Sequence, residues 1–315
     1  MRSGVKNMKK ILSLIVVSIC ICFVMIFYME KQEIKDKNLG ISTKKNNPIN
    51  EAKEEINKEE NLIEHDENAD EQLNGEEEIK EEESLIEYIT LAPESVRIPI
   101  LMYHSISDDD PDNSLLVPIA MFNEQMLWLK ENGFTAMSMD EALEAMTTGT
   151  VPKKPVVISF DDGYADNYYN AFPILKEHGM KGTFFIITDR TDTDGWYMSS
   201  AMLREMNEAG MEIENHTSNH LELNSLSREE QIASIKNGQD TLRQLVGVES
   251  EYLCYPVGRY DDITIDVSKE LGIKAAVTTQ GGISSINDGS YELKRVRISP
   301  MSIEGFASIF SEYIY

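Results

Sequence analysis

Cysteine and histidine are scarce in this chain of 315 residues, which has three cysteines and five histidines. Cys20 and Cys22 lie in an N-terminal apolar run, so Cys254 is the only cysteine in the rest of the chain. A single cysteine can form neither an intramolecular disulfide nor a CxxC metal site. We therefore expect Cys254 to be a small buried residue beside a strand.

Basic residues are also scarce. The net charge is −26, and residues 98–315 hold 34 Asp and Glu against 16 Lys and Arg. Because nucleic-acid phosphates are bound through basic patches, this composition excludes nucleic acid as a partner. An acidic surface also repels anionic lipid and other polyanions. The composition fits a neutral substrate, or one that gains positive charge on reaction.

One uncharged apolar run, 11–28, is 18 residues long and follows Lys9 and Lys10. This is close to the lower limit for a helix that spans a bilayer. No small-x-small cleavage site follows the run, so we predict a cytoplasmic tip and an uncleaved signal anchor over residues 1–29. The predicted location is the cell membrane, single-pass, with the rest of the chain extracytoplasmic. Secretion after signal cleavage is the alternative.

Residues 30–96 are rich in Glu, Lys and Asn and low in aromatic residues. Such a segment cannot bury enough apolar surface to offset the entropy lost on ordering. It is therefore predicted to be an acidic disordered linker. The folded domain is expected to cover residues 97–315.

Short apolar runs alternate with helical patterns after the linker. The predicted strands are 98–103, 156–160, 183–187, 211–215, 252–255, 275–279 and 296–298. The predicted helices are 122–130, 168–178, 199–209, 228–245 and 262–271. This alternation predicts an α/β fold with a parallel sheet, either doubly wound or closed into a barrel. In both cases a functional site lies at the carboxyl ends of the strands.

The sequence Asp161-Asp162-Gly163 directly follows one predicted strand. Two adjacent carboxylates raise each other's pKa. A metal ion would relieve this repulsion by binding one carboxylate, and the other could then act as a general base. Asp-Asp-Gly after a strand is also a common simple turn.

His216 and His220 follow another predicted strand in an HxxxH pattern. On a helical turn, residues four apart share a face, so both imidazoles could bind one metal ion. His104 also lies just past a predicted strand. One Asp and two His also occur in non-haem iron oxygenases, but the strand-helix alternation argues against that class.

A third pattern, Tyr255-Pro256-Val257-Gly258, ends another apolar run. A Pro-x-Gly turn can direct backbone N–H groups into a cleft, where they stabilise an oxyanion. Taken alone, the pattern indicates only a loop.

Together, SFDDG at 159–163 and HTSNH at 216–220 resemble the polysaccharide deacetylase family, also called the NodB-homology domain or carbohydrate esterase family 4. The resemblance covers roughly residues 98–300, and MYHS at 102–105 resembles the branch that deacetylates poly-N-acetylglucosamine. It implies a distorted (β/α)7-type barrel. It also implies a hydrolase of non-peptide carbon–nitrogen bonds in linear amides. Its partner would be an acetylated cell-surface or extracellular glycan polymer.

Roles are carried over by position from the family pattern. Asp161 resembles the catalytic base, which takes a proton from a metal-bound water. The turn at 255–258 resembles the oxyanion-binding motif, through the N–H of Val257. The ligands of a divalent metal, zinc or another transition ion, would be Asp162, His216 and His220.

The chain departs from the family pattern at three points, one of which is Val257, where the family has an aromatic residue. The arginine that orients the base is replaced by Cys254, and no histidine follows His220 to act as the late general acid. In the poly-N-acetylglucosamine branch the first-strand histidine takes the acid role, which here implies His104. Two alternatives stay open: a glycan-binding envelope protein with impaired catalysis, and an O-acetyl esterase of the xylan type.

Further expectations concern the substrate and the assembly. Sugar stacking is expected from the aromatic residues near the motifs, namely Tyr164, Trp196 and Tyr197. The chain is expected to be a monomer.

Overall fold

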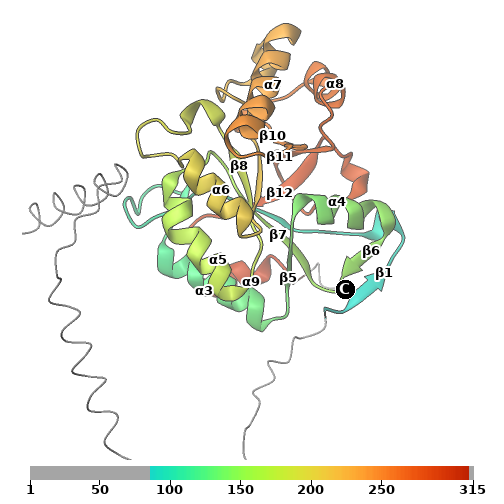
Figure 1. The fold of residues 1–315 in the computed structure, drawn as a ribbon. Coiled ribbons are helices and arrows are strands. Elements are labelled where there is room, and N and C mark those ends of the chain that lie inside the picture. The colour runs from blue at the N-terminus through green and yellow to red at the C-terminus, as the bar shows by residue number, and fades with distance from the viewer. Residues whose placement is uncertain (1–85, 312–315) are drawn as a thin grey trace, which may run out of the picture. The chain divides into compact units, whose positions relative to one another are not determined.

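The computed structural model describes residues 86–311 (Figure 1). These residues belong to the unit Glu81–Tyr315. The predicted signal anchor and most of the predicted linker lie outside the described residues. Within 86–311, no helix is long and apolar enough to cross a membrane.

Seven parallel strands close into a barrel in the order β2-β12-β11-β10-β9-β8-β7, with β7 pairing back to β2. Their bounds are β2 Ile100–Tyr103, β7 Pro155–Phe160, β8 Thr183–Ile186, β9 Glu212–Asn215, β10 Tyr252–Cys254, β11 Ala275–Gly281 and β12 Leu293–Arg297. The predicted α/β barrel is therefore confirmed, and each predicted strand is one of these seven. An eighth strand, β5 (Thr135–Met137), pairs with the first half of β7.

Helices cover the outside of the barrel (Figure 1). They are α3 Ile119–Glu131, α4 Met139–Thr148, α5 Phe172–His178, α6 Ser200–Glu208, α7 Arg228–Leu245, α8 Asp262–Glu270 and α9 Ile303–Ser308. Helices α3, α5 and α9 lie together on one side, and α7 packs beside α8. The predicted helix 168–178 is two elements, because a π-helical segment, Asn167–Ala171, precedes α5.

The folded domain begins earlier than residue 97. Strand β1 (Tyr88–Thr90) pairs antiparallel with β6 (Thr150–Pro152), and a 3-10 turn, Pro93–Ser95, follows it. Ile89 and Leu91 pack against a cluster of core residues. Ordered structure thus extends before the predicted boundary at 97. In the sequence, these few apolar residues follow a long acidic stretch that masks their pattern. A small parallel sheet, β3 (Ser105–Ile106) and β4 (Leu116–Val117), lies beyond β2.

Alternate residues of the barrel strands belong to different core clusters. Ile100, Val157 and Phe185 share one cluster, while their neighbours Leu101 and Ile158 belong to another that includes α3, α5 and α6. Strands covered on both faces are apolar throughout instead of alternating with polar residues. This is why the strands stand out as short apolar runs in the sequence.

Candidate active site

Asp161 and Asp162 follow β7 at the carboxyl end of the barrel, and both are buried. Asp162 has a left-handed backbone with φ of 72°, as do Thr217 at 64°, His220 at 57° and Val257 at 56°. These are four of the five non-glycine residues with positive φ among residues 86–311. Each such residue costs about 1–2 kcal/mol, and strain of this kind gathers at functional sites.

Three side chains from two strand ends converge on one point. Asp162 Oδ1 lies 3.4 Å from His216 Nε2 and 3.4 Å from His220 Nε2. His216 Nδ1 is 2.8 Å from the carbonyl oxygen of Cys254. Because a carbonyl only accepts, Nδ1 carries a proton, so Nε2 is the ring atom that faces Asp162 and could bind a metal ion. Burial, followed by repulsion from His216, lowers the pKa of His220 and favours the neutral imidazole that metal ions bind.

The expected helical turn at 216–220 is wrong, because this segment is a loop. Its shape comes from the left-handed residues Thr217 and His220, and the His220 N–H donates to Thr217 Oγ1 at 3.0 Å. The loop brings the two imidazole centroids to 4.8 Å from each other. The two imidazoles therefore converge as predicted, by a different local geometry.

Asp161 is paired with Arg295, a residue that the sequence motifs did not reveal. Arg295 Nη1 and Nη2 donate to Asp161 Oδ1 and Oδ2, each at 2.7 Å. The remaining N–H groups of the guanidinium reach Ser159 Oγ at 3.2 Å, Cys254 Sγ at 3.2 Å and the Thr278 carbonyl at 2.9 Å. All five N–H donors are thus used.

The guanidinium decides the charge of the predicted base. Burial alone would raise the pKa of Asp161, but the charge and hydrogen bonds of Arg295 hold it well below its usual value. Arg295 comes from β12, whereas the family pattern places the arginine at position 254. The small Cys254 side chain lies against this guanidinium. In the sequence, Arg295 could have been noticed because a predicted strand carries basic residues between the apolar Leu293 and Val296.

A second group of potential ligands, Asp161, His216 and Cys254, also has its donor atoms within 4.8 Å of one another. Both oxygens of Asp161 and the sulfur of Cys254 already accept from Arg295. A cation therefore already neutralises this group. The donor set of Asp162, His216 and His220 has no such partner among the described residues and fits a divalent transition metal.

His104 follows β2 and faces the same centre, with Nε2 4.0 Å from Asp161 Oδ2. Its loop is held by the segment that follows the aspartate pair. Asn167 Nδ2 donates to the His104 carbonyl at 2.8 Å, and Asn170 Nδ2 donates to the Ile106 carbonyl at 2.7 Å. Asp166 accepts from Ser105 Oγ at 2.5 Å and from the Ile106 N–H at 3.2 Å. One segment thus positions both Asp161 and His104.

The turn after β10 has one backbone donor to offer. The N–H groups of Tyr255 and Gly258 donate to Val277 and Tyr255 carbonyls, and Pro256 has no N–H. This leaves the Val257 N–H without a hydrogen bond inside the turn. Gly258 is required, because its φ is 69° and an added Cβ would lie 2.0 Å from Thr279 Oγ1.

Aromatic residues stand beside this centre. Tyr164 stacks on Tyr197 with ring centroids 5.2 Å apart. Trp196 is 73% exposed, and its carbonyl accepts from the Ala165 N–H at 2.8 Å. The predicted stacking residues are therefore brought together next to the Asp161–Asp162 segment.

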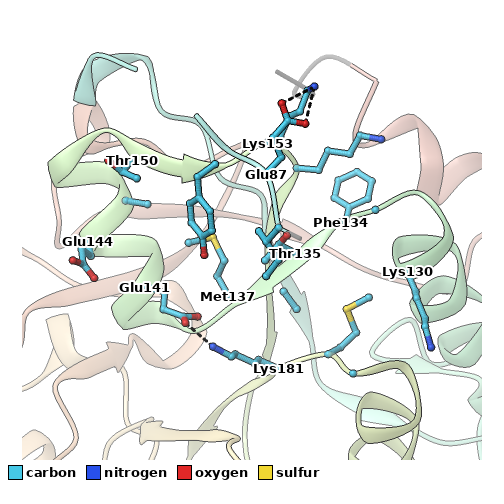
Figure 2. A pocket seen from close by; sticks show the side chains of 18 of the residues that line it. Glu87, Lys130, Phe134, Thr135, Met137, Glu141, Glu144, Thr150, Lys153 and Lys181 are labelled. Atoms are coloured by element: carbon cyan, nitrogen blue, oxygen red, sulfur yellow. Dashed lines mark hydrogen bonds and ion pairs between the residues drawn. The ribbon is translucent and has the colours of Figure 1, made fainter. Parts of the chain in front are cut away.

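A large cavity of about 910 Å³ lies elsewhere, at the end of the barrel where β5 and β7 begin (Figure 2). Its charged side chains are largely paired: Lys153 Nζ lies 3.2 Å from Glu87 and Lys181 Nζ lies 2.5 Å from Glu141. None of the predicted site residues lines it. In parallel barrels this end serves stability, whereas chemistry occurs at the other end.

Replacing both imidazoles, His216→Ala with His220→Ala, is expected to abolish metal binding. Loss of an outer hydrogen-bond partner alone weakens metal affinity about 10–100-fold, so loss of two ligands should cost more. Metal content of the purified full chain, measured after equilibration with zinc, checks this. His178→Gln is the control, because His178 lies at the far cavity. Undiminished metal content in the double variant would defeat the ligand assignment.

Comparison with known proteins agrees with this arrangement. A family model described as Polysaccharide deacetylase matches residues 148–276. YxkH of Bacillus subtilis (strain 168), a protein assigned to the polysaccharide deacetylases, is 39% identical over 219 residues, which are 69% of this chain and 76% of YxkH. The poly-beta-1,6-N-acetyl-D-glucosamine N-deacetylase of Staphylococcus aureus (strain MSSA476) is 28% identical over 201 residues, 59% of this chain and 68% of that protein.

Among solved structures, the Streptococcus pyogenes deacetylase PplD in complex with acetate superposes with a TM-score of 0.66 at 34% identity. The match covers 68% of this chain and 98% of PplD. These matches place the seven-stranded barrel among the hydrolases of the polysaccharide deacetylase type. The chain belongs to the polysaccharide deacetylase family, and the resemblance seen in the sequence is confirmed.

Proposed function

We propose that this chain is a metal-dependent N-deacetylase, which removes acetyl groups from N-acetylglucosamine units of a cell-surface or extracellular polysaccharide. The observation that carries the proposal is the position of Asp161. It is buried and held ionised by Arg295, and it adjoins Asp162, whose carboxylate meets two imidazoles. The name of the staphylococcal relative supports the choice of an N-acetylglucosamine polymer.

Asp162, His216 and His220 would hold the metal ion, which when bound supplies Lewis acidity toward the acetyl carbonyl and makes water more acidic. The carboxylate of Asp161 accepts the proton of the attacking water. As negative charge develops on the carbonyl oxygen, the Val257 N–H donates a hydrogen bond to it. Arg295 keeps Asp161 charged and fixes the direction of its oxygens.

His104 delivers the proton to the departing amine. Burial lowers the pKa of His104, although Asp161 opposes the shift, so the imidazole is neutral before reaction. The proton must therefore reach His104 during the reaction. Asp161, whose Oδ2 lies 4.0 Å from His104 Nε2, is the acid formed in the first step and supplies this proton. Asn167, which holds the His104 carbonyl, maintains this geometry.

The proposed location is outside the cytoplasm, tethered to the cell membrane through residues 1–29. The uncharged run 11–28 and the preceding lysines support it. A tethered enzyme would meet a surface polymer more often than a diffusing nutrient.

Acetate release by the purified full chain, loaded with zinc, tests the function. The substrates are poly-N-acetylglucosamine, peptidoglycan, chitin oligomers and acetylated xylan. We expect release from the first and no release from xylan. Release from xylan alone would favour an O-acetyl esterase. Metal binding without release from any of the four would favour a glycan-binding protein with impaired catalysis.

His104→Gln is expected to lower kcat for de-N-acetylation roughly 10²–10³-fold, because a poor leaving amine needs a proton. Hydrolysis of 4-nitrophenyl acetate should fall much less, since nitrophenolate leaves without one. The comparison of the two substrates is the measurement, and His178→Gln is the matched control. Equal loss on both substrates would contradict the role of His104 as general acid.

A further inference from the structure

A second group of aromatic side chains lies one helical turn beyond the catalytic segment. It forms an open groove of about 540 Å³ between the π-helical segment, α5 and α6. We call it the tyrosine groove. Its lining residues are Tyr168, Tyr169, Phe172, Pro173, Lys176, Glu177 and Glu205.

The rings of the groove form a continuous surface. Tyr168 contacts Tyr169 edge to face with centroids 5.3 Å apart, and it stacks on Phe172 at 5.8 Å. The Tyr168 hydroxyl donates to Glu205 Oε2 at 2.7 Å, which fixes its ring. Tyr169 is 61% exposed. Tyr169 therefore presents a ring face to solvent beside the fixed ring of Tyr168.

The local backbone explains why two successive tyrosines share this surface. Residues Asn167–Ala171 form a π-helix, in which the wider turn changes the direction of each side chain relative to an α-helix. Single-turn π-helices are rare and occur frequently at functional sites. Here the π-helix directly follows the segment that carries Asp161 and Asp162.

The chemistry of the groove matches a sugar ring. A pyranose presents a face of C–H groups, which packs on an aromatic ring, and an edge of hydroxyl groups, which hydrogen-bond to carboxylates. Tyr169 offers the ring, and Glu177 and Glu205 offer the carboxylates. Lys176 also lies in the groove, with Nζ over the Phe172 ring at 5.1 Å from its centroid, so the two carboxylates outnumber the one cation. This balance suits glucosamine, whose amine becomes an ammonium after deacetylation.

The groove and the active site share one segment of the chain. Tyr164 stacks on Tyr197 beside Asp162, and it precedes Tyr168 by four residues. The π-helix that carries Tyr168 and Tyr169 also carries Asn167, whose Nδ2 holds the His104 carbonyl at the active site. Helix α6 accompanies this path, since Glu205 contacts Tyr168.

We propose that the tyrosine groove is a distal subsite, which binds the N-acetylglucosamine polymer at units beyond the one that reacts. This inference rests on the proposed function. The occupant of the groove would be the same glycan chain that enters the active site. Tyr169 would then be a determinant of specificity for long substrates.

Tyr169→Ala is the test. We expect the ratio of kcat/KM for the polymer to kcat/KM for the disaccharide to fall roughly five- to tenfold. The reason is that the variant removes the one ring face that a distal sugar unit would contact. Tyr169→Phe should restore the ratio, because it keeps the ring. Tyr88→Ala, which removes another exposed tyrosine from β1, is the control. A ratio that Tyr169→Ala leaves unchanged overturns the proposal.

Direct binding separates this inference from the proposed function. If the wild-type chain releases no acetate, equilibrium binding of poly-N-acetylglucosamine to the full chain still reports on the groove. A Kd weakened roughly five- to tenfold by Tyr169→Ala, but not by Tyr88→Ala, supports the subsite. Equal Kd values for wild type and Tyr169→Ala overturn it.

Discussion

Asp161→Asn is expected to lower kcat for acetate release roughly 10²–10⁴-fold, the contribution of a positioned general base. The amide keeps the shape of the carboxylate but cannot accept a proton from water at neutral pH. KM should change much less, because Asp161 takes no part in the proposed binding of the sugar. Steady-state kinetics of the full chain on the N-acetylglucosamine polymer measure both constants.

Two measurements test whether the loss of kcat has another cause, such as loss of the metal ion or a general effect of removing a carboxylate. Metal content of Asp161→Asn should match wild type, since the proposed ligands are other residues. Asp266→Asn, which changes an exposed carboxylate on α8, should keep wild-type kcat. Retention of more than half of the wild-type kcat by Asp161→Asn would eliminate it as the base.

Arg295→Met is expected to reduce the free energy of unfolding by about 3–5 kcal/mol, the usual result of breaking one partner of a buried ion pair. The variant leaves Asp161 buried without its counter-charge and loses the hydrogen bonds to Ser159 and Thr278. Denaturant unfolding at neutral pH measures the change. Arg297→Met is the matched control, because it removes an exposed arginine from the same strand and should cost less than about 0.5 kcal/mol.

The Arg295→Met variant should also alter the pH dependence of stability and of kcat/KM. In wild type the depressed pKa of Asp161 gives a stabilisation that is present above its ordinary pKa and is lost as the pH falls. Without Arg295, burial raises the pKa, so the carboxylate becomes protonated at higher pH. The acid limb of the kcat/KM profile should then move to higher pH.

The double variant Arg295→Met with Asp161→Asn separates the contribution of the ion pair to stability from that of other core contacts. It should recover part of the lost stability, because no buried charge is left unpaired. A double variant that is no more stable than Arg295→Met would show that the ion pair is not the cause.

The barrel could be predicted because its strands are covered on both faces. Residues such as Val157 and Ile158 face different core clusters, so each strand is a short apolar run with a helix after it. Helix α7 was predicted with its observed bounds from the helical spacing of its apolar residues, and the structure shows a capping box of Ser227 and Glu230 at its start. Strand β5 was missed, because its three residues, Thr135–Met137, carry too short a pattern.

The grouping of candidate site residues could be predicted where those residues lie near each other in the sequence. Asp161 and Asp162 are adjacent, and His216 and His220 share one loop, so motif spacing was enough to group them. Arg295 lies 134 residues from Asp161, and their contact depends on the closure of the barrel. From the sequence, Cys254 in place of the family arginine indicated that Asp161 has no guanidinium partner. The structure shows that β12 supplies this guanidinium instead.

Closure of the barrel by its last strand also determines when, during synthesis, the site becomes complete. Strand β12 joins β2 through the pairing of Val296 with Leu101, which connects the last strand to the first. During synthesis, Asp161 leaves the ribosome well before Arg295 has been made. A nascent or truncated chain thus carries Asp161, the proposed base, without the guanidinium that keeps it ionised and oriented. Hydrolytic activity would begin only after the final strand is in place, so catalysis reports on completion of the polypeptide.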